Sequence, residues 1–182
     1  MWKLAAVTVL AVLVASAGCR KKEAPPAGGG EPINLNALSE IDNYKEILRK
    51  DPNNLQAIIN IANLYFDTRQ DLLAIENYKK ALAIAPGNVD VRTDLAVCYR
   101  RTGKTDQAIE ELKKAISLNP RHAQSRYNLG VILIHDKNDP EGGIRAWEGL
   151  LENVPDYPYR DNLKAEIARM RAMIDSMRPK TK

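Results

Sequence analysis

The chain has 182 residues, of which 45% are hydrophobic and 27% charged, an average composition for a globular protein with one core. Its net charge is +4, and Lys and Arg are interleaved with Asp and Glu along the chain, so no basic stripe with aromatic residues indicates nucleic-acid binding. A single Phe among many Ala and Leu residues favours helix over sheet.

Residues 1–18 have the layout of a secretory signal peptide. Lys3 supplies a positive charge, and the uncharged, almost wholly apolar run that follows is too short to cross a bilayer comfortably as a helix. The run ends in Ser16, Ala17 and Gly18, three small residues directly before Cys19.

This ending resembles the lipobox of bacterial lipoproteins, although that family prefers a larger apolar residue in place of Ser16. The resemblance implies cleavage before Cys19, acylation of Cys19 and a lipid anchor in a membrane of the cell envelope. Arg20 replaces the Asp that some bacteria use as an inner-membrane retention signal, which favours the periplasmic face of an outer membrane if the host has one. The alternatives are an ordinary cleaved signal or an uncleaved anchor with an incidental cysteine.

Residues 19–35 are rich in Pro and Gly and predict a flexible linker. Its basic triplet, residues 20–22, either touches anionic head groups or is simply solvated. Residues 36–52 then predict an N-terminal flanking helix, which Asp51 and Pro52 end. It resembles the second helix of a repeat unit, and its predicted apolar face comprises Leu38, Ile41, Tyr44, Ile47 and Leu48.

A 34-residue period organises the middle of the chain. Pro86 and Pro120 share this offset with five other pairs, such as Tyr65 and Tyr99. The pattern resembles the tetratricopeptide repeat, whose units are antiparallel helix pairs that stack into a right-handed superhelix. The units are residues 55–88, residues 89–122 and a degenerate third unit, residues 123–157. Family positions are filled by Ile58, Ile61, Ala62, Tyr65, Ala74, Tyr78, Ala81 and Pro86, then by Arg92, Leu95, Ala96, Tyr99, Ala108, Leu112, Ala115 and Pro120.

The third unit departs from the pattern. Its closing proline, Pro155, comes one residue late, which predicts an insertion in the turn 135–140. With that shift Gly143, Trp147 and Leu150 take the places of the family's Ala, Phe and Ala. The small residues of all units (Ala62, Ala81, Ala96, Ala115 and Gly130) are expected where helices approach closely.

Helix starts are marked by capping residues. Asn53, Asn88 and His122 stand near the start of each first helix, and Asp71, Thr105 and Asp139 are predicted to cap each second helix, with Pro140 at a first helical position.

Residues 158–178 predict a C-terminal amphipathic helix. Leu163, Ile167, Met170, Ile174 and Met177 recur at spacings of four and three. This helix is interpreted as a solvating cap, although the same spacing also suits a dimerising coiled coil.

No catalytic or cofactor-binding pattern is present in the sequence. His122 and His135 lack metal-ligand spacing with cysteines or carboxylates, and Cys98 is expected to be a small buried residue. The sequence therefore predicts a protein that is not an enzyme, with neither a metal nor a cofactor.

The tetratricopeptide resemblance implies a concave groove, lined by the first helix of each unit, that binds an extended peptide or a helix of a protein partner. Ile59 stands at the first lysine position of the carboxylate-clamp members, so that mode is disfavoured. The groove residues are Gln56, Ile59, Asn63, Phe66, Asp90, Thr93, Val97, Arg100, Gln124, Tyr127, Val131 and Ile134.

Together these features predict a lipid-anchored scaffold in an envelope complex for secretion, pilus assembly, outer-membrane assembly or cell-wall synthesis. Phe66 and Tyr127 are the expected anchors for the partner. Three alternatives remain. The chain is a homo-oligomeric structural lipoprotein that assembles through the C-terminal helix, or its groove is filled by the protein's own linker or terminal helix, or it is a small enzyme, which is disfavoured because no polar residues converge.

Overall fold

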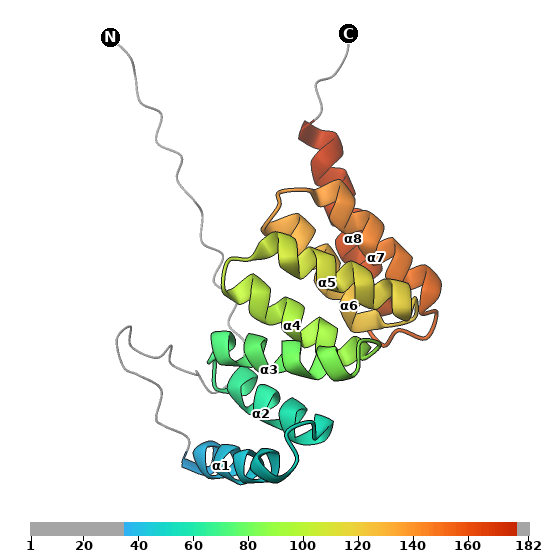
Figure 1. Ribbon diagram of the computed structural model, residues 1–182. Helices are drawn as coiled ribbons and strands as arrows, with labels where there is room; N and C mark the ends of the chain where they lie inside the picture. Colours follow the sequence, from blue (N-terminus) through green and yellow to red (C-terminus); the bar gives the residue numbers. More distant parts are fainter. Residues whose placement is uncertain (1–34, 178–182) are drawn as a thin grey trace, which may run out of the picture. The chain divides into compact units, whose positions relative to one another are not determined.

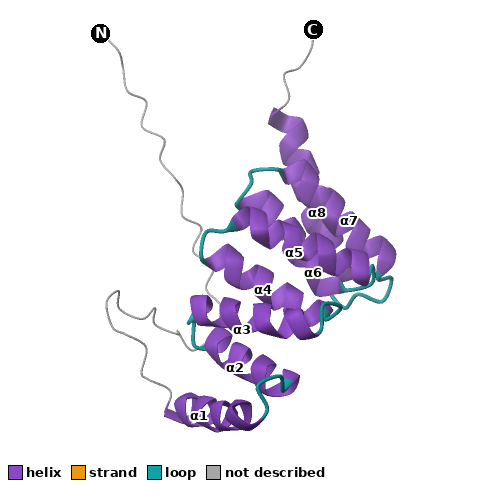
Figure 2. Cartoon of the chain, viewed as in Figure 1, coloured by secondary structure: helices purple, strands orange, loops and turns teal. Residues whose placement is uncertain are grey.

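The computed structural model describes residues 35–177, so the predicted signal peptide, Cys19 and the linker up to residue 34 lie outside the described residues. Regular structure within this range is helical throughout (Figures 1 and 2). The helices are α1 (Leu35–Lys50), α2 (Leu55–Asp67), α3 (Asp71–Ile84), α4 (Val89–Arg101), α5 (Thr105–Leu118), α6 (Ala123–His135), α7 (Pro140–Asn153) and α8 (Arg160–Met177). None of these helices combines the length and apolar composition needed to cross a membrane.

The first helix of each hairpin begins with a side-chain cap. Asn54 and Asn88 accept hydrogen bonds from the backbone N–H three residues on, and His122 accepts one from the N–H of Ser125 through its ring. The cap of α2 is therefore Asn54, the neighbour of Asn53, which stands near the helix start as expected. The Asp51 carboxylate accepts from the N–H of Asn53 and from the side chain of Asn54.

The second helices begin differently. Gln70 and Lys104 precede α3 and α5 without any side-chain capping bond, so Asp71 and Thr105 are first helical residues and not the predicted caps. Only α7 matches the expectation, because the Asp139 carboxylate accepts from the N–H of Gly142 and Pro140 opens the helix.

The helices form a curved two-layer stack (Figure 1). Three hairpins, α2–α3, α4–α5 and α6–α7, follow one another, and each second helix packs on the first helix of the next hairpin. The first helices also approach each other, α2 with α4 and α4 with α6. The second helices do not: no Cα atom of α3 comes within 8 Å of α5, and none of α5 comes within 8 Å of α7. The stack therefore curves toward α2, α4 and α6, which line its concave face. This arrangement confirms the predicted all-helical solenoid.

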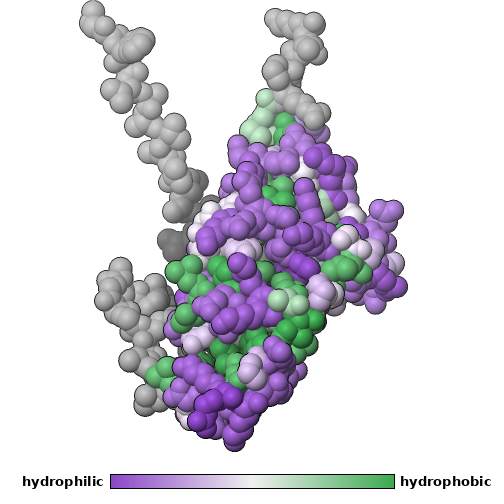
Figure 3. All heavy atoms as spheres, in the orientation of Figure 1, coloured by the Kyte–Doolittle hydropathy of each residue, from purple (hydrophilic) through white to green (hydrophobic). Residues whose placement is uncertain are grey.

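Buried residues form two hydrophobic clusters, one running from α2 to α6 and one formed by α7 and α8. The small residues expected at close approaches, Ala62, Ala81, Ala96, Ala115 and Gly130, are all buried. A Cβ atom added to Gly130 would overlap the indole of Trp147, so this glycine is what allows α6 and α7 to come together. On the visible surface, apolar side chains gather around α2 to α4, and polar ones dominate the rest (Figure 3).

The flanking helices close the stack with their apolar faces. In α1 the buried residues are Ala37 and Ile41, and the predicted face is wrong at Leu38 and Ile47, which are 44% and 42% exposed. In α8, Leu163 and Ile167 are buried against α7 as expected, as is Met170.

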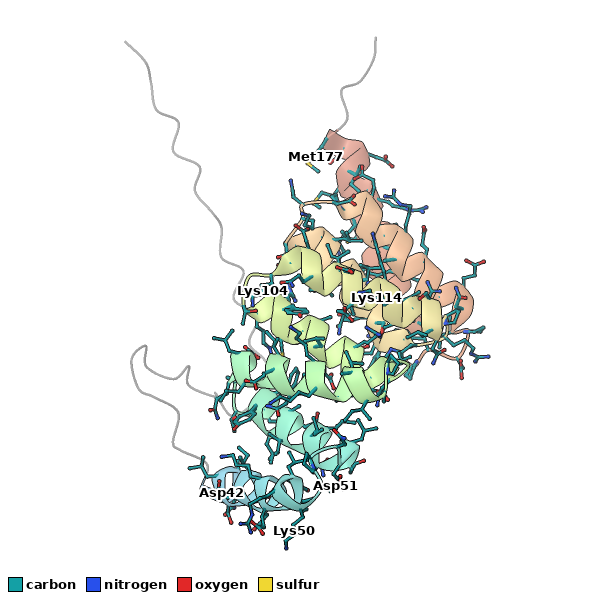
Figure 4. All side chains as sticks on the ribbon, in the orientation of Figure 1. Asp42, Lys50, Asp51, Lys104, Lys114 and Met177 are labelled. Atoms are coloured by element: carbon teal, nitrogen blue, oxygen red, sulfur yellow. The ribbon has the colours of Figure 1, made fainter. Side chains whose placement is uncertain are left out.

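Both flanking helices also carry residues that face the solvent. Met177 is 68% exposed at the free end of α8 (Figure 4). Asp42 and Lys50 lie on the outer side of α1 in the same view (Figure 4).

The connections show where the third unit departs from the first two. The turn between α6 and α7, residues 136–139, is one residue longer than residues 68–70 and 102–104, which confirms the predicted insertion. The connection between α7 and α8, residues 154–159, is also longer than residues 85–88 and 119–122. As a consequence α8 does not occupy the place of a fourth first helix, and none of its Cα atoms comes within 8 Å of α6.

Candidate functional site

The predicted groove residues lie on α2, α4 and α6, the three helices of the concave face. Gln56, Asn63, Asp90, Gln124 and Tyr127 are exposed. The half-buried members are Ile59, Phe66, Val97, Arg100, Val131 and Ile134. Eleven of the twelve predicted residues are therefore at least partly accessible on these helices, with a single exception.

That exception is Thr93, which is fully buried and does not belong to a contact surface. Its hydroxyl donates to the carbonyl of Val89 at 2.8 Å and lies 2.7 Å from the hydroxyl of Ser125. Thr93 thus joins α4 to α6 inside the stack. The tetratricopeptide resemblance implied that Thr93 lines the groove, and this is wrong because Ser125 of α6 lies against it.

Asp90, His122 and Ser125 stand in the order of a catalytic triad. The ring of His122 lies 2.9 Å from an Asp90 oxygen and 2.6 Å from the Ser125 hydroxyl. Ser125, however, is fully buried, and its hydroxyl is shared between His122 and Thr93, so a substrate carbonyl has no access to it. The ring also caps α6. The arrangement is a structural link between α4 and α6.

Phe66 and Asn63 take part in packing as well as lining the concave face. The Phe66 ring meets Tyr78 edge-on at 6.5 Å between centroids, and the Arg101 guanidinium lies 4.2 Å above it. The Tyr78 hydroxyl donates to the Asn63 side chain at 2.8 Å. Phe66, one of the two expected anchors for the partner, is therefore also part of the packing between helices.

The arginines at the end of α4 are neutralised locally. Arg100 forms a bidentate ion pair with Asp136 beyond α6, at 2.5 and 3.2 Å. Arg101 donates to Asp71 at 3.2 Å. Because both guanidinium groups already have carboxylate partners, neither offers a free positive charge to a ligand.

Negative charge gathers in the middle of the concave face. Asp94 on α4 is half-buried, and burial, followed by the neighbouring carboxylates of Asp90 and Asp67, raises its pKa to about 6. Within residues 35–177, neither Asp67 nor Asp94 forms an ion pair with Lys or Arg. The chain is basic overall, yet this part of the face is acidic.

An aromatic pocket of about 530 Å³ opens between α6 and α8. The Tyr127 ring stacks on Trp147, with centroids 5.8 Å apart and planes at 15°, and Tyr157 meets Tyr159 edge-on at 5.9 Å. We call this site the aromatic pocket. Its lining residues are Tyr127, Trp147, Tyr157, Tyr159, Asn162, Leu163 and Glu166.

Of the residues that line the aromatic pocket, the sequence predicted only Tyr127 as a binding residue. Trp147 was assigned to packing, and it is indeed 5% exposed, with its indole N–H donating to the carbonyl of Tyr127 at 3.0 Å. Tyr157 and Tyr159 lie in the long connection before α8, outside the repeat pattern. Their one sequence signal is two tyrosines flanking Pro158, in a chain with seven tyrosines in all.

Residues 35–177 hold no group of three His, Cys, Asp or Glu side chains placed to bind a metal. Cys98 is fully buried, and burial raises the pKa of its thiol to about 12. A thiol held protonated at neutral pH is neither a nucleophile nor a metal ligand.

Comparison with known families matches the repeat region. Two models described as "Tetratricopeptide repeat" match residues 55–88 and 73–115, and one described as "TPR repeat" matches residues 98–134. No curated protein matches the chain.

Solved structures resemble this fold at low sequence identity. The crystal structure of the MamA protein matches with a TM-score of 0.67 and 23% identity, covering 78% of this chain and 76% of that chain. MamA residues 41 to the end from Desulfovibrio magneticus RS-1 match with a TM-score of 0.61, 19% identity and coverage of 65% and 66%. A tetratricopeptide repeat protein from Parabacteroides merdae ATCC 43184 gives a TM-score of 0.67, 20% identity and coverage of 77% and 56%. These likenesses concern the fold.

Proposed function

Because this chain is a tetratricopeptide-repeat protein, we propose that it is a non-catalytic scaffold that holds a segment of a partner protein along its concave face. The observation that carries the proposal is the concave face itself. It combines exposed amides, carboxylates without ion-pair partners and an open aromatic pocket, and two buried clusters hold the helices in place. Rigid elements that present mixed apolar and polar groups suit an extended peptide or a helix.

The proposed contact surface excludes Thr93 and gives less weight to Phe66. Val97 on α4 and Gln124 on α6 are the better probes, because neither side chain makes a hydrogen bond or ring contact within residues 35–177. Changing them perturbs a bound partner with little effect on packing.

Site-specific crosslinking tests the groove. A photoreactive residue at Val97 or Gln124 should capture the same partner in cells, whereas one at Leu118, 51% exposed on α5, should not. Capture from Leu118 alone would place the partner on the outer layer and contradict the proposal.

The lipoprotein part of the proposal rests on Ser16-Ala17-Gly18-Cys19. A diacylated or triacylated Cys19 would hold the scaffold on the envelope membrane more firmly than a single acyl chain, since each buried methylene contributes about 0.8 kcal/mol. The linker of residues 19–35 would let the repeats reach partners in a secretion, pilus, outer-membrane or cell-wall complex.

Replacing Cys19 with Ala tests the anchor. We expect the Cys19→Ala variant to lose membrane partitioning or to remain an uncleaved precursor. The measurement is membrane fractionation together with the intact mass of the protein. A wild-type mass with an unmodified Cys19 would contradict lipidation and leave the groove assignment untouched.

A further inference from the structure

We propose that the aromatic pocket binds a proline-rich segment of the partner protein that carries a basic residue next to its prolines. This inference rests on the proposed function, because it specifies the chemistry of the partner at the α8 end of the concave face. The pocket differs from the rest of the face in both its ring content and its hydrogen-bonding groups.

Exposed ring faces are the first argument. Tyr127 and Tyr159 are 40% and 65% exposed although each is in contact with another aromatic ring, so the rings are held in place without being covered. Buried Trp147 supports Tyr127 from below. Rigid aromatic surfaces of this kind bind polyproline II segments, whose stiff rings lose little entropy on docking.

The polar groups of the pocket give the second argument. Tyr127, Tyr157 and Tyr159 each carry a hydroxyl, and Asn162 carries an amide, and within residues 35–177 these side-chain groups form no hydrogen bond. Burial, together with the neighbouring Tyr127 and Tyr159, raises the pKa of Tyr157, so that its hydroxyl stays protonated and able to donate. Such a set of donors matches a backbone whose carbonyls are free and whose prolines lack N–H groups.

Charge supplies the third argument. Glu166 is the one charged residue among those lining the pocket, and the faces of tyrosine rings also attract cations. Arg169 pairs with Glu166 from the next turn of α8, but both side chains are exposed, and exposed ion pairs are weak. The acidic residues Asp67 of α2 and Asp94 of α4 extend this preference for a basic segment beyond the pocket.

The pocket exists because of how the last helix is attached. The connection 154–159 carries Tyr157 and Tyr159 out from α7, and α8 then packs on α7 without approaching α6. In a fourth repeat unit, the first helix would pack against α6 and α7 and fill this space. Here α8 leaves the space open, and aromatic rings line it.

Peptide titration of the full-length chain in detergent micelles tests the inference. The probe is a synthetic peptide of two arginines followed by six prolines, and its binding is measured by calorimetry. We expect saturable binding, weakened about 30-fold by Tyr159→Ala if this ring is a hot spot of about 2 kcal/mol. Glu166→Gln should weaken it several-fold, and Leu72→Ala, a change at a residue 66% exposed on α3, should leave it unchanged. Circular dichroism verifies that each variant is folded.

Control peptides separate the parts of the inference. If a peptide with glutamates in place of the arginines binds equally well, the pocket does not prefer a basic residue. If a peptide with alternating glycine and serine in place of the prolines binds equally well, the pocket does not prefer proline. Binding insensitive to both pocket variants, or no binding at all, would overturn the site, while crosslinking from Val97 would still report on the groove.

The chain's own linker is the last competitor. Residues 20–26 combine a basic triplet with Pro25 and Pro26. If a peptide of residues 19–33 binds more tightly than the arginine–proline probe, the occupant is this segment and the assignment to a partner is wrong.

Discussion

Residue size is matched across each hairpin at one pair of positions. In the first unit the pair is Ala62 and Tyr78, and in the second it is Ala96 and Leu112, all four buried in the same cluster. In the third unit the pair is Gly130 and Trp147, whose ring lies directly against the glycine. The smallest residue thus stands opposite the largest. Gly143 repeats the effect, since an added Cβ would lie 2.9 Å from the carbonyl oxygen of Gly130.

Gly130→Ala should therefore destabilise the protein. Alanine normally gains up to about 1 kcal/mol over glycine inside a helix. Here the new methyl group would overlap the Trp147 ring, which is fixed by its own hydrogen bond, and overpacking costs about 1–3 kcal/mol. We expect a net loss of about 1–2 kcal/mol in the free energy of unfolding, measured by urea denaturation.

Gly87→Ala is the matched control. An added Cβ at Gly87 meets no atom within 4 Å, and its φ is not in the left-handed region. This change should be neutral or slightly stabilising. A Gly130→Ala variant as stable as Gly87→Ala would show that Trp147 moves aside at no cost.

Asp94 should make stability depend on pH. Its pKa is about 6 in the folded protein against an ordinary value of 3.8, because of burial and then of Asp90 and Asp67, with His122 and Arg101 acting in the opposite direction. The folded state thus prefers the protonated carboxyl. Ionised Asp94 destabilises the fold above about pH 6, and this penalty disappears as pH falls from about 6 to 4.

Replacing the carboxyl with an amide isolates this effect. At pH 7.5 we expect Asp94→Asn to raise the free energy of unfolding by about 1 kcal/mol, after allowing for screening by solvent. At pH 4 the difference should vanish. Asp42→Asn, at a carboxylate 75% exposed, should show no such pH dependence. A stabilisation by Asp94→Asn that is equal at both pH values would mean that the charge is not its cause.

The limits of sequence reasoning at this scale follow from tertiary contacts. The family resemblance implied that Thr93 faces the groove, but the burial of Thr93 depends on Ser125 and His122, about thirty residues away. Arg92 and Arg126 likewise make contacts that the sequence does not reveal, because each donates to the carbonyl of the preceding closing proline, Pro86 or Pro120.

At the scale of elements, the turns inside the hairpins share one backbone conformation. Arg69, Gly103 and Asn138 have φ of 59°, 75° and 52°, and they occupy equivalent positions once the insertion is counted. Each turn follows a first helix and reverses the chain. Only glycine adopts this conformation without steric cost, so the first and third turns carry strain that the second lacks.

Arg69→Gly should therefore stabilise the first hairpin. The gain in the free energy of unfolding should be about 0.5–1 kcal/mol, since glycine removes the left-handed strain but adds entropy to the unfolded chain. The reverse change, Gly103→Ala, should cost about 1 kcal/mol. Thermal melts of the two variants should shift in opposite directions, and shifts of the same sign would contradict this explanation.

The elements themselves were largely predictable, because the 34-residue period fixes helix, turn and helix in each unit. The placement of α8 was not. Its apolar stripe predicted a helix, but a stripe does not specify which neighbour it covers. The length of the connection 154–159 decides this, and with it the aromatic pocket.

For the whole molecule, α8 acts as the cap of a one-dimensional stack. Its buried residues Leu163, Ile167 and Met170 cover Trp147 and Leu150 of α7, so little of its apolar stripe remains for a second copy of the chain. Met173 and Met177, 52% and 68% exposed, are what a dimer would have to use. Repeat proteins are stabilised by interactions between neighbouring units, so loss of a cap should act locally.

Ile167→Ala tests the cap. Removing a buried isoleucine side chain costs about 2–5 kcal/mol, and because α8 contacts only α7, the cost should be felt mainly in α6 to α8. Hydrogen exchange followed by mass spectrometry should show faster exchange there and little change in α2 and α3. Met173→Ala, at an exposed position on the same helix, is the control and should alter neither exchange nor sedimentation. If Met173→Ala instead converts a dimer to a monomer, then α8 joins two copies, and the homo-oligomeric alternative replaces the cap.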